Sequence, residues 1–379
     1  MKNKKFFIKL LILLIISIFS ILFVYNDYFL YKRPILKIDR IKEELENNES
    51  SDEKNITQYI YGTIMNTKDK GRKIKVINHT TTSGVYDEQV HKNSELFVEL
   101  KKGDTAIGIS EIKRDKYIVI LLVIFVDAIV LAAGNKGVKT LVSLLVNILI
   151  SGLAIFLFQQ HAKTWNMLFL YFGVAIFFIT LSLFITNGRK KKTLAAILSS
   201  TASLFISFLL AFLIIKLYKK PIPYWTLDYI EAVHDYENFF YVTILLSGLG
   251  AIMDISITIS SSLNELIEKN PKIKLKTLIN SGKEISKDVI GTMTNVMLFT
   301  CFTSIIPMTF LMMKNNIVLG EALQRYGQVE LIVVLTSCIA IVLAIPISLF
   351  ISTLVLKPSN KRRGIKWYLY YHLYFLLFL

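Results

Sequence analysis

One aspartate, Asp254, lies inside an apolar run that is long enough to cross a bilayer as a helix. An ionisable side chain is costly at that depth, so it usually faces the interior of a helical bundle or a water-filled path. Small and hydroxyl-bearing residues recur near it at steps of three and four, which places them on its helix face: Ser247, Gly250, Ala251, Thr258 and Ser261. The spacing predicts a packed, polar face on which Asp254 binds a cation or carries a proton. A purely structural hydrogen bond of Asp254 is the alternative.

A second polar group lies in the next apolar run, where Asn295 follows Gly291 by one helical turn. We expect Asp254 and Asn295 near the same end of their spans, and we therefore predict a hydrogen bond between them. Asp127 is a further acid within an apolar run, and two acids in one bundle are able to bind a cation or relay protons. The predicted polar transport path consists of Asp254, Asn295, Asp127, Thr258 and Ser247.

Close helix packing is expected where small residues let a neighbouring helix approach. These residues are Gly248, Gly250, Ala251 and Gly291. The charged segment 265–290 joins the two spans, and its candidate contact residues are Glu265, Glu284 and Asp288. We expect this loop to lie in the cytoplasm, where it is able to dock a cytosolic partner. Its amphipathic part, residues 273–290, is typical of a helix that lies on the membrane surface.

No motif of a soluble enzyme is present in the sequence. Residues 281–284 lack the first glycine and the closing hydroxyl residue of a nucleotide-binding P-loop, and no zinc-protease or serine-hydrolase motif occurs. The two cysteines, Cys301 and Cys338, have the spacing of neither a metal site nor a redox pair. We expect no catalytic residue and no cofactor, and the sequence leaves a metal site undefined. A membrane-embedded enzyme would require Asp127 and Asp254 to converge.

Composition indicates a membrane protein. Hydrophobic residues make up 53% of the chain, and the mean hydropathy is +0.51. The formal net charge is +16, but the basic residues cluster beside the apolar runs, where positive charge sets membrane orientation. No basic helix interleaved with base-stacking aromatic residues is evident, so we expect the lipid bilayer and not nucleic acid as the partner.

The pattern of apolar runs predicts a mainly α-helical membrane bundle of about eight spans with a small extracytoplasmic β domain between the first two. The expected spans are residues 6–25, 117–133, 140–158, 167–185, 193–215, 239–259, 292–313 and 331–356. The expected division is a membrane anchor at 1–25, a linker at 26–56, a β domain at 57–115, a seven-span bundle at 116–356, and a basic, aromatic tail at 357–379.

The β domain is predicted from short runs divided by turn residues, at 59–64, 73–78, 95–100 and 105–112. Such spacing is typical of a small β-sandwich or barrel. The preceding stretch, residues 37–54, carries Ile38, Ile41 and Leu45 at helical spacing, and we interpret it as a linker or a short helix.

Basic residues are concentrated in alternate loops, and this distribution predicts the orientation. The positive-inside rule places both termini in the cytoplasm and the β domain outside a bacterial plasma membrane. The basic loops are residues 136–139, 189–192, 269–287 and 357–363, and the opposite loops are poorer in basic residues or balanced by acids.

Two sequence elements resemble a known family. The Gly-Ala-Ile-Met-Asp run that ends at Asp254 and the Gly-Thr-Met-Thr-Asn run that ends at Asn295 are similar to motifs of the YibE/YibF-like membrane protein family. The resemblance covers about residues 117–356, and the anchor and external domain before the bundle resemble the YibE type. It implies a multispanning protein related to transport, without an established substrate, and a shorter homologous membrane protein as a possible partner.

We therefore expect a transporter or permease component whose path passes Asp254. The alternative is a sensor or structural protein in which the external domain detects a signal and the 265–290 loop reports it inside. The two differ in whether function depends on Asp254 or on the β domain.

Overall fold

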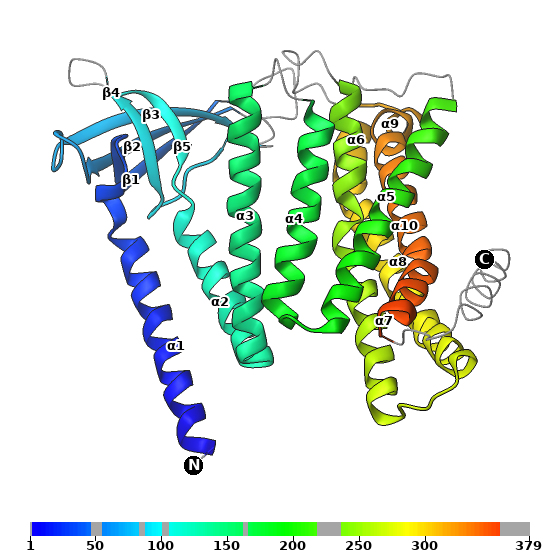
Figure 1. The fold of residues 1–379 in the computed structure, drawn as a ribbon. Coiled ribbons are helices and arrows are strands. Elements are labelled where there is room, and N and C mark those ends of the chain that lie inside the picture. The colour runs from blue at the N-terminus through cyan, green and yellow to red at the C-terminus, as the bar shows by residue number, and fades with distance from the viewer. Residues whose placement is uncertain are drawn as a thin grey trace. The chain divides into compact units, whose positions relative to one another are not determined.

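The computed structural model describes residues 2–46, 55–82, 88–100, 106–161, 166–217 and 236–356. The chain divides into two compact units, residues 1–138 and 139–379, and each is described by itself (Figure 1). The tail predicted at 357–379 lies outside the described residues.

The first unit contains a sheet whose strands come between two apolar helices in the sequence. It begins with α1 (Lys2–Tyr25) and the 3-10 helix η1 (Asp27–Leu30), and it ends with α2 (Asp115–Ala133). Between them lie the strands β1 (Ile35–Glu46), β2 (Asn55–Ile64), β3 (Lys73–Thr81), β4 (Glu95–Leu100) and β5 (Ala106–Ile112). The strands form one antiparallel sheet in the order β3-β2-β1-β4-β5. α1 and α2 pack against each other below it (Figure 1).

The sheet buries one face because apolar and polar side chains alternate along its strands. In β3, Ile74 and Val76 are buried, whereas Lys73 and Lys75 are exposed. The buried cluster consists of Leu36, Ile38, Ile60, Ile64, Ile74, Val76, Val90, Leu96 and Val98. The edge strands β3 and β5 also lie near each other, so the domain is a single curled sheet, which agrees with the predicted barrel and not with the predicted sandwich.

The prediction of a linker or short helix at 37–54 is wrong, because Ile35–Glu46 is strand β1 at the centre of the sheet. The register of β1 against β2 shifts between Ile38 and Arg40, which marks a β-bulge. A bulge adds one residue to a strand, so the inward positions step by three there instead of two. Ile38 and Ile41 thus both face the core, and their spacing imitates that of a helix.

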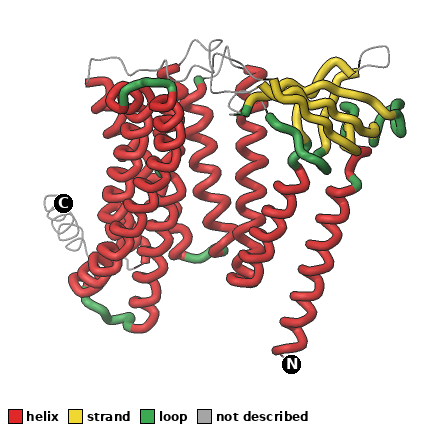
Figure 2. The backbone as a smooth tube through the Cα atoms, turned by 180° about the vertical axis from the view of Figure 1, so that it is seen from behind, coloured by secondary structure: helices red, strands yellow, loops and turns green. Residues whose placement is uncertain are grey.

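The second unit is helical. Its elements are α3 (Asn135–His161), α4 (Met167–Asn187), α5 (Lys191–Leu217), α6 (Tyr236–Ser247), α7 (Leu249–Lys269), α8 (Leu275–Lys314), α9 (Leu319–Ala322), the π-helical turn η3 (Leu323–Gly327) and α10 (Gln328–Leu356). The helices run nearly side by side (Figure 2). In the described part of the whole chain, seven helices are long and apolar enough to cross a membrane, with α6 and α7 counted as one span, and the apolar part of α1, Leu10–Tyr25, is shorter. The predicted mainly helical fold with a small antiparallel sheet domain before the bundle is confirmed.

The core of this unit lies where α5, α7 and α10 pack together. Large aliphatic residues fill it, including Ile252, Ile255 and Ile259 from α7 and Ile341 and Ile345 from α10. Fully buried serines lie among them, which lets the helices approach closely, as is usual for helix pairs in membranes.

The segment predicted to lie on the membrane surface, residues 273–290, differs from that expectation. From Leu275 it is the first part of α8, a single helix of 40 residues. Leu278 and Ile279 are buried, and a Cβ atom at Gly282 would clash with Leu349 of α10. The start of α8 therefore packs against α10 and does not lie apart from the bundle.

Candidate functional site

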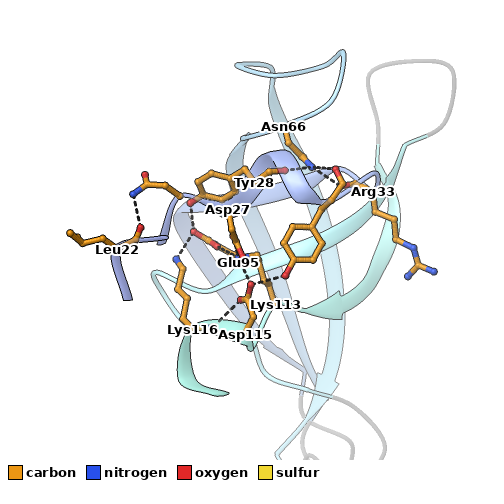
Figure 3. A network of polar contacts seen from close by, with 11 residues as sticks. Leu22, Asp27, Tyr28, Arg33, Asn66, Glu95, Lys113, Asp115 and Lys116 are labelled. Atoms are coloured by element: carbon orange, nitrogen blue, oxygen red, sulfur yellow. Dashed lines mark hydrogen bonds and ion pairs between the residues drawn. The ribbon is translucent and has the colours of Figure 1, made fainter. Parts of the chain in front are cut away.

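A cluster of charged and polar side chains lies in the first unit, where η1, the sheet and the start of α2 meet (Figure 3). We call this cluster the polar junction; its members are Asp27, Tyr28, Tyr31, Asn66, Glu95, Lys113, Asp115 and Lys116. Each comes from the end of an element, because η1 follows α1 directly, Glu95 begins β4, and the lysines flank the first residue of α2.

Lys113 is the centre of the polar junction. Its Nζ lies 2.6 Å from Asp27 Oδ1, 2.7 Å from Asp115 Oδ2 and 3.7 Å from Glu95 Oε2. The residue is only 4% exposed, and Asp27 and Glu95 are 3% and 2% exposed. A buried ammonium group is tolerated only when it is paired, and here three carboxylates surround it.

Glu95 is bound mainly through one of its two oxygens. The Tyr28 hydroxyl and the Lys116 ammonium group, whose Nζ is 2.6 Å away, both donate to Glu95 Oε1. Glu95 Oε2 is buried and has no hydrogen-bond donor among the described residues. Tyr31 in turn donates its hydroxyl to Asp115 Oδ2 at 2.8 Å.

Asn66 fixes the backbone that carries these groups. Its side-chain Nδ2 donates to the carbonyl oxygens of Tyr28, Tyr31 and Arg33 at 3.3, 2.9 and 2.9 Å, and its Oδ1 accepts from the amide of Ile35 at 2.7 Å (Figure 3). One amide side chain thereby ties η1 and the chain after it to the turn beyond β2.

Burial and charge pairing act in opposite directions on the pKa values of Asp27 and Lys113. Burial raises the pKa of Asp27, and the neighbouring Lys113 only partly offsets that effect. For Lys113 burial alone would lower the pKa, but the bonds to Asp115 and Asp27 outweigh it, so the pKa is raised. Burial and the carboxylate acceptors raise the pKa of both Tyr28 and Tyr31. The tyrosines therefore remain donors at physiological pH.

The polar junction joins several elements of the first unit. Its charge pairs connect η1, β4 and the start of α2 through Asp27, Glu95 and the two lysines. Among the described residues, no group of three or more potential ligands is arranged to hold a metal ion. The junction is not predictable from local sequence, because its members are far apart in the chain. The only local signal was the charged run that begins at Lys113, directly before an apolar span.

Asp254 lies in α7, but on a different face from the one that packs. The buried face carries Ile252, Ile255, Ser256, Ile259, Ser260 and Leu263. Asp254 is exposed, as are Gly250 and Thr258, whereas Ala251 is buried. The expectation that Asp254 lies on the packed face is therefore not met. In the described part of the chain, no hydrogen bond or ion pair joins Asp254 to Asn295.

The packed face of α7 carries its own polar contacts, in the form of serine pairs with α10. Ser256 pairs with Ser348 at 3.0 Å and Ser260 with Ser352 at 2.7 Å. Ser247, predicted to line the transport path, pairs in the same way with Ser337 at 2.7 Å. The serine pairs hold these two parallel spans together.

In α8 the second motif also lies on an open face. Gly291 and Asn295 are exposed, and so is Asp288 one turn earlier. No atom lies within 4 Å of the position that a Cβ atom of Gly291 would take, and the same is true of Gly250. Gly248 differs, because its Cβ position lies 3.5 Å from the Cα atom of Ser337. Of the four predicted packing positions, only Gly248 and Ala251 thus lie in helix contacts.

Asp127 has a partner in the first unit. The Ser17 hydroxyl of α1 lies 3.0 and 2.9 Å from the two carboxylate oxygens of Asp127 on α2. This contact joins the two helices that flank the sheet. Asp127 is thereby bound within the first unit, whereas Asp254 and Asn295 belong to the second.

The charged residues predicted as cytoplasmic contacts lie on the surface. Glu265 pairs with Lys269 at 2.7 Å, and Glu284 pairs with Lys287 at 2.8 Å. Such exposed pairs within one helix contribute little to stability, which leaves their side chains available to another molecule.

Comparison with known proteins supports the motif resemblance. A model described as YibE/F-like protein matches residues 121–358, and a model described as YibE/F family N-terminal domain matches residues 29–113. The chain belongs to the YibE/F-like family. The N-terminal match begins within η1 and contains all five strands, so β1 belongs to the family's N-terminal domain and not to a linker. No curated protein and no solved structure matches the chain.

Proposed function

We propose that this YibE/F-like protein is a component of a bacterial plasma-membrane transport system, in which Asp254 lies on a polar path completed by a second membrane subunit. One observation carries the proposal: Asp254 is exposed on a membrane-spanning helix that packs through its other face. A carboxylate in contact with lipid is costly, so a partner protein or water must cover it. Thr258 on α7 and Asn295 on α8 offer further polar groups on exposed faces.

The interior of the single chain favours this shared path over an internal one. A cavity between α5, α6 and α10 has a volume of about 10 Å³, which is room for about one water molecule. Ser207, Thr336 and Ser337 are its hydroxyl-bearing residues, and the other lining residues are apolar. We therefore assign transport to the outer face of α7. A shorter homologous membrane protein is the partner that we propose.

The proposed orientation follows the basic loops. Both termini lie in the cytoplasm and the sheet domain lies outside, as the positive-inside rule requires for lysines at 136–139 and 269–287. The proposal gives Asp254 a role in cation or proton binding without covalent chemistry.

A second candidate function is sensing, and the polar junction favours it. A signal that moved the sheet would act on α1 and α2 directly, since Asp27, Glu95 and Asp115 meet at Lys113. This function requires the external domain but not Asp254.

Transport is tested in inverted membrane vesicles from the native host, so that any partner subunit is present. The vesicles are acidified inside, and the collapse of the proton gradient is followed with an acridine dye after addition of Na⁺, K⁺ or Mg²⁺ chloride. We expect a cation-dependent collapse with the wild-type protein and at least a tenfold slower one with Asp254→Asn. Glu268→Gln, which changes an exposed acid in the last turn of α7, is the control and is expected to keep the wild-type rate.

Two results would overturn the proposal. One is the lack of any cation-dependent signal in wild-type vesicles. The other is an equal rate in Asp254→Asn vesicles that contain normal amounts of protein. Loss of function on deletion of the sheet domain, together with tolerance of Asp254→Asn, would establish sensing instead.

A further inference from the structure

The open face of the sheet carries an array of basic and aromatic side chains. Neighbouring residues on β1, β2 and β3 lie in three rows across the strands: Lys37, Thr63 and Lys73; Arg40, Tyr61 and Lys75; Lys42, Tyr59 and Ile77. Residues directly opposite each other in antiparallel strands share a face, so these rows form one surface. We call it the basic face; its cations are Lys37, Arg40, Lys42, Lys73 and Lys75, and all five are exposed.

Acidic residues on this surface are fewer. Asp39 lies at the bulge and accepts a hydrogen bond from the Thr63 hydroxyl at 2.9 Å, and Glu44 lies further along β1. Glu95 of the polar junction is paired with Lys37 in the register of β1 and β4, but its side chain is buried. Among the described residues, none of the five cations forms an ion pair. The basic face therefore has an excess of positive charge. This contrasts with the polar junction of the same domain, where the lysines are paired with carboxylates.

Tyrosine rings hold two of the cations in place. The Lys75 Nζ lies 4.1 Å from the centre of the Tyr59 ring and 5.8 Å from that of Tyr61, and the Arg40 guanidinium carbon lies 5.0 Å from the Tyr61 ring centre. Cation–π contacts of this kind restrain long side chains without neutralising them. The positive charge is therefore positioned and remains available to an anion.

The spacing of these charges fits an extended anion. Arg40 and Lys42 on β1, like Lys73 and Lys75 on β3, are two residues apart, which is about 7 Å, and β1 and β3 are two strand spacings apart, which is about 10 Å. A single phosphate group spans neither distance. A chain of phosphate groups would contact several cations at once and release their counterions, which is the main source of affinity in such complexes.

We propose that the basic face binds inorganic polyphosphate, a linear, water-soluble phosphate polymer. The covered tyrosine rings argue against nucleic acid, because base recognition on a sheet uses open aromatic rings for stacking. This proposal goes beyond the transport function and does not depend on Asp254. It places the ligand outside the cell under the proposed orientation.

The test uses the purified full-length protein in nanodiscs of zwitterionic lipid and fluorescently labelled inorganic polyphosphate as the probe. Binding is measured by fluorescence anisotropy at salt concentrations from about 50 to about 200 mM, because phosphate contacts lose much of their affinity over this range. We expect Arg40→Gln/Lys75→Gln to weaken binding at least tenfold and to reduce the slope of log Kd against log salt by about 2, since two phosphate contacts are lost. The control Lys70→Gln/Lys92→Gln removes the same charge from exposed positions outside the face and is expected to bind as the wild type does.

Other outcomes would overturn the proposal. Equal weakening by both double variants would mean that only net charge matters, and no binding by the wild type would mean that the basic face serves solubility alone. Single-stranded DNA that binds more tightly than polyphosphate of equal charge would assign the face to nucleic acid. Strong weakening of polyphosphate binding in nanodiscs that contain phosphatidylglycerol would assign it to lipid headgroups. None of these results depends on the vesicle assay of Asp254.

Discussion

Carboxylates have opposite surroundings in the polar junction and on the face of α7 that carries Asp254. In the junction, Asp27 and Asp115 are bound to Lys113 within the same unit, and the charges are buried. On α7, Asp254 lies on an exposed face, although it occupies a membrane span where an unpaired charge costs more. A carboxylate that is satisfied inside its own unit stabilises that unit, whereas an unsatisfied one in a span indicates a ligand or a partner.

The packing of α7 strengthens this distinction. Its inner face already uses hydroxyl groups, Ser256 and Ser260, in pairs with α10. Adhesion within the bundle therefore does not need the motif that contains Asp254. Under the proposed function, that motif contacts a partner outside the described bundle, and the same proposal covers Asn295 on α8.

The largest effect is expected from the centre of the polar junction. Lys113→Met leaves three buried carboxylates without their common cation, which should destabilise the sheet domain by about 3–5 kcal/mol. Hydrogen exchange of β1 and β4 in the full-length protein, read by mass spectrometry, measures this loss as faster exchange. The exposed lysine Lys92 is the matched control, and Lys92→Met is expected to change stability by less than about 0.5 kcal/mol. Unchanged hydrogen exchange in Lys113→Met would contradict this prediction, because the polar junction would then not stabilise the sheet domain.

A substitution on α7 is expected to change stability in the opposite direction. Asp254→Leu removes a carboxylate from an exposed position in a span, and insertion scales put the gain on the order of 3 kcal/mol. We therefore expect the melting midpoint of the purified protein, measured by size-exclusion chromatography after heating, to rise or stay unchanged. Asp27→Leu makes the same chemical change in the junction and should lower the midpoint, since Lys113 loses a partner. A fall in both variants would show that Asp254 is already paired within the chain.

The sequence was sufficient to predict the spans and four of the five strands. Apolar runs of span length have few alternatives, and β4 was placed at Glu95–Leu100 as observed. β1 was missed for a physical reason: its bulge converts the two-residue alternation into a three-residue step at Ile38 and Ile41. Local spacing cannot distinguish such a strand from a helical turn, because only pairing with β2 reveals the extra residue.

The site residues are harder to predict than the elements, for a different physical reason. Helical spacing correctly groups Gly250, Asp254 and Thr258 on one face, but it does not say which face packs. Ser256 and Ser260 form a second small, polar stripe on α7, and that one contacts α10. The polar junction was beyond local reasoning, because antiparallel pairing of β4 with β1 and β5 is what brings Glu95 to Lys113.

The smallest predicted effect concerns the tyrosine that donates to Glu95. Burial and that carboxylate raise the pKa of Tyr28, so the folded protein keeps its phenolic proton at a pH where the unfolded chain, with a pKa near 10, has lost it. The folded state then binds more protons than the unfolded state, and stability must fall as pH rises above 10. One proton corresponds to about 1.4 kcal/mol per pH unit.

We therefore expect Tyr28→Phe to lose about 1.4 kcal/mol less stability than the wild type for each unit of pH above 10. This difference in stability is measured by urea unfolding of the sheet domain, followed by near-ultraviolet circular dichroism at chosen pH values from about 9 to 11. Tyr117→Phe is the control, because this exposed tyrosine of α2 has no partner role in the junction. Parallel pH profiles for wild type and Tyr28→Phe would mean that Tyr28 ionises equally in both states, and the junction would then hold its carboxylates through the lysines alone.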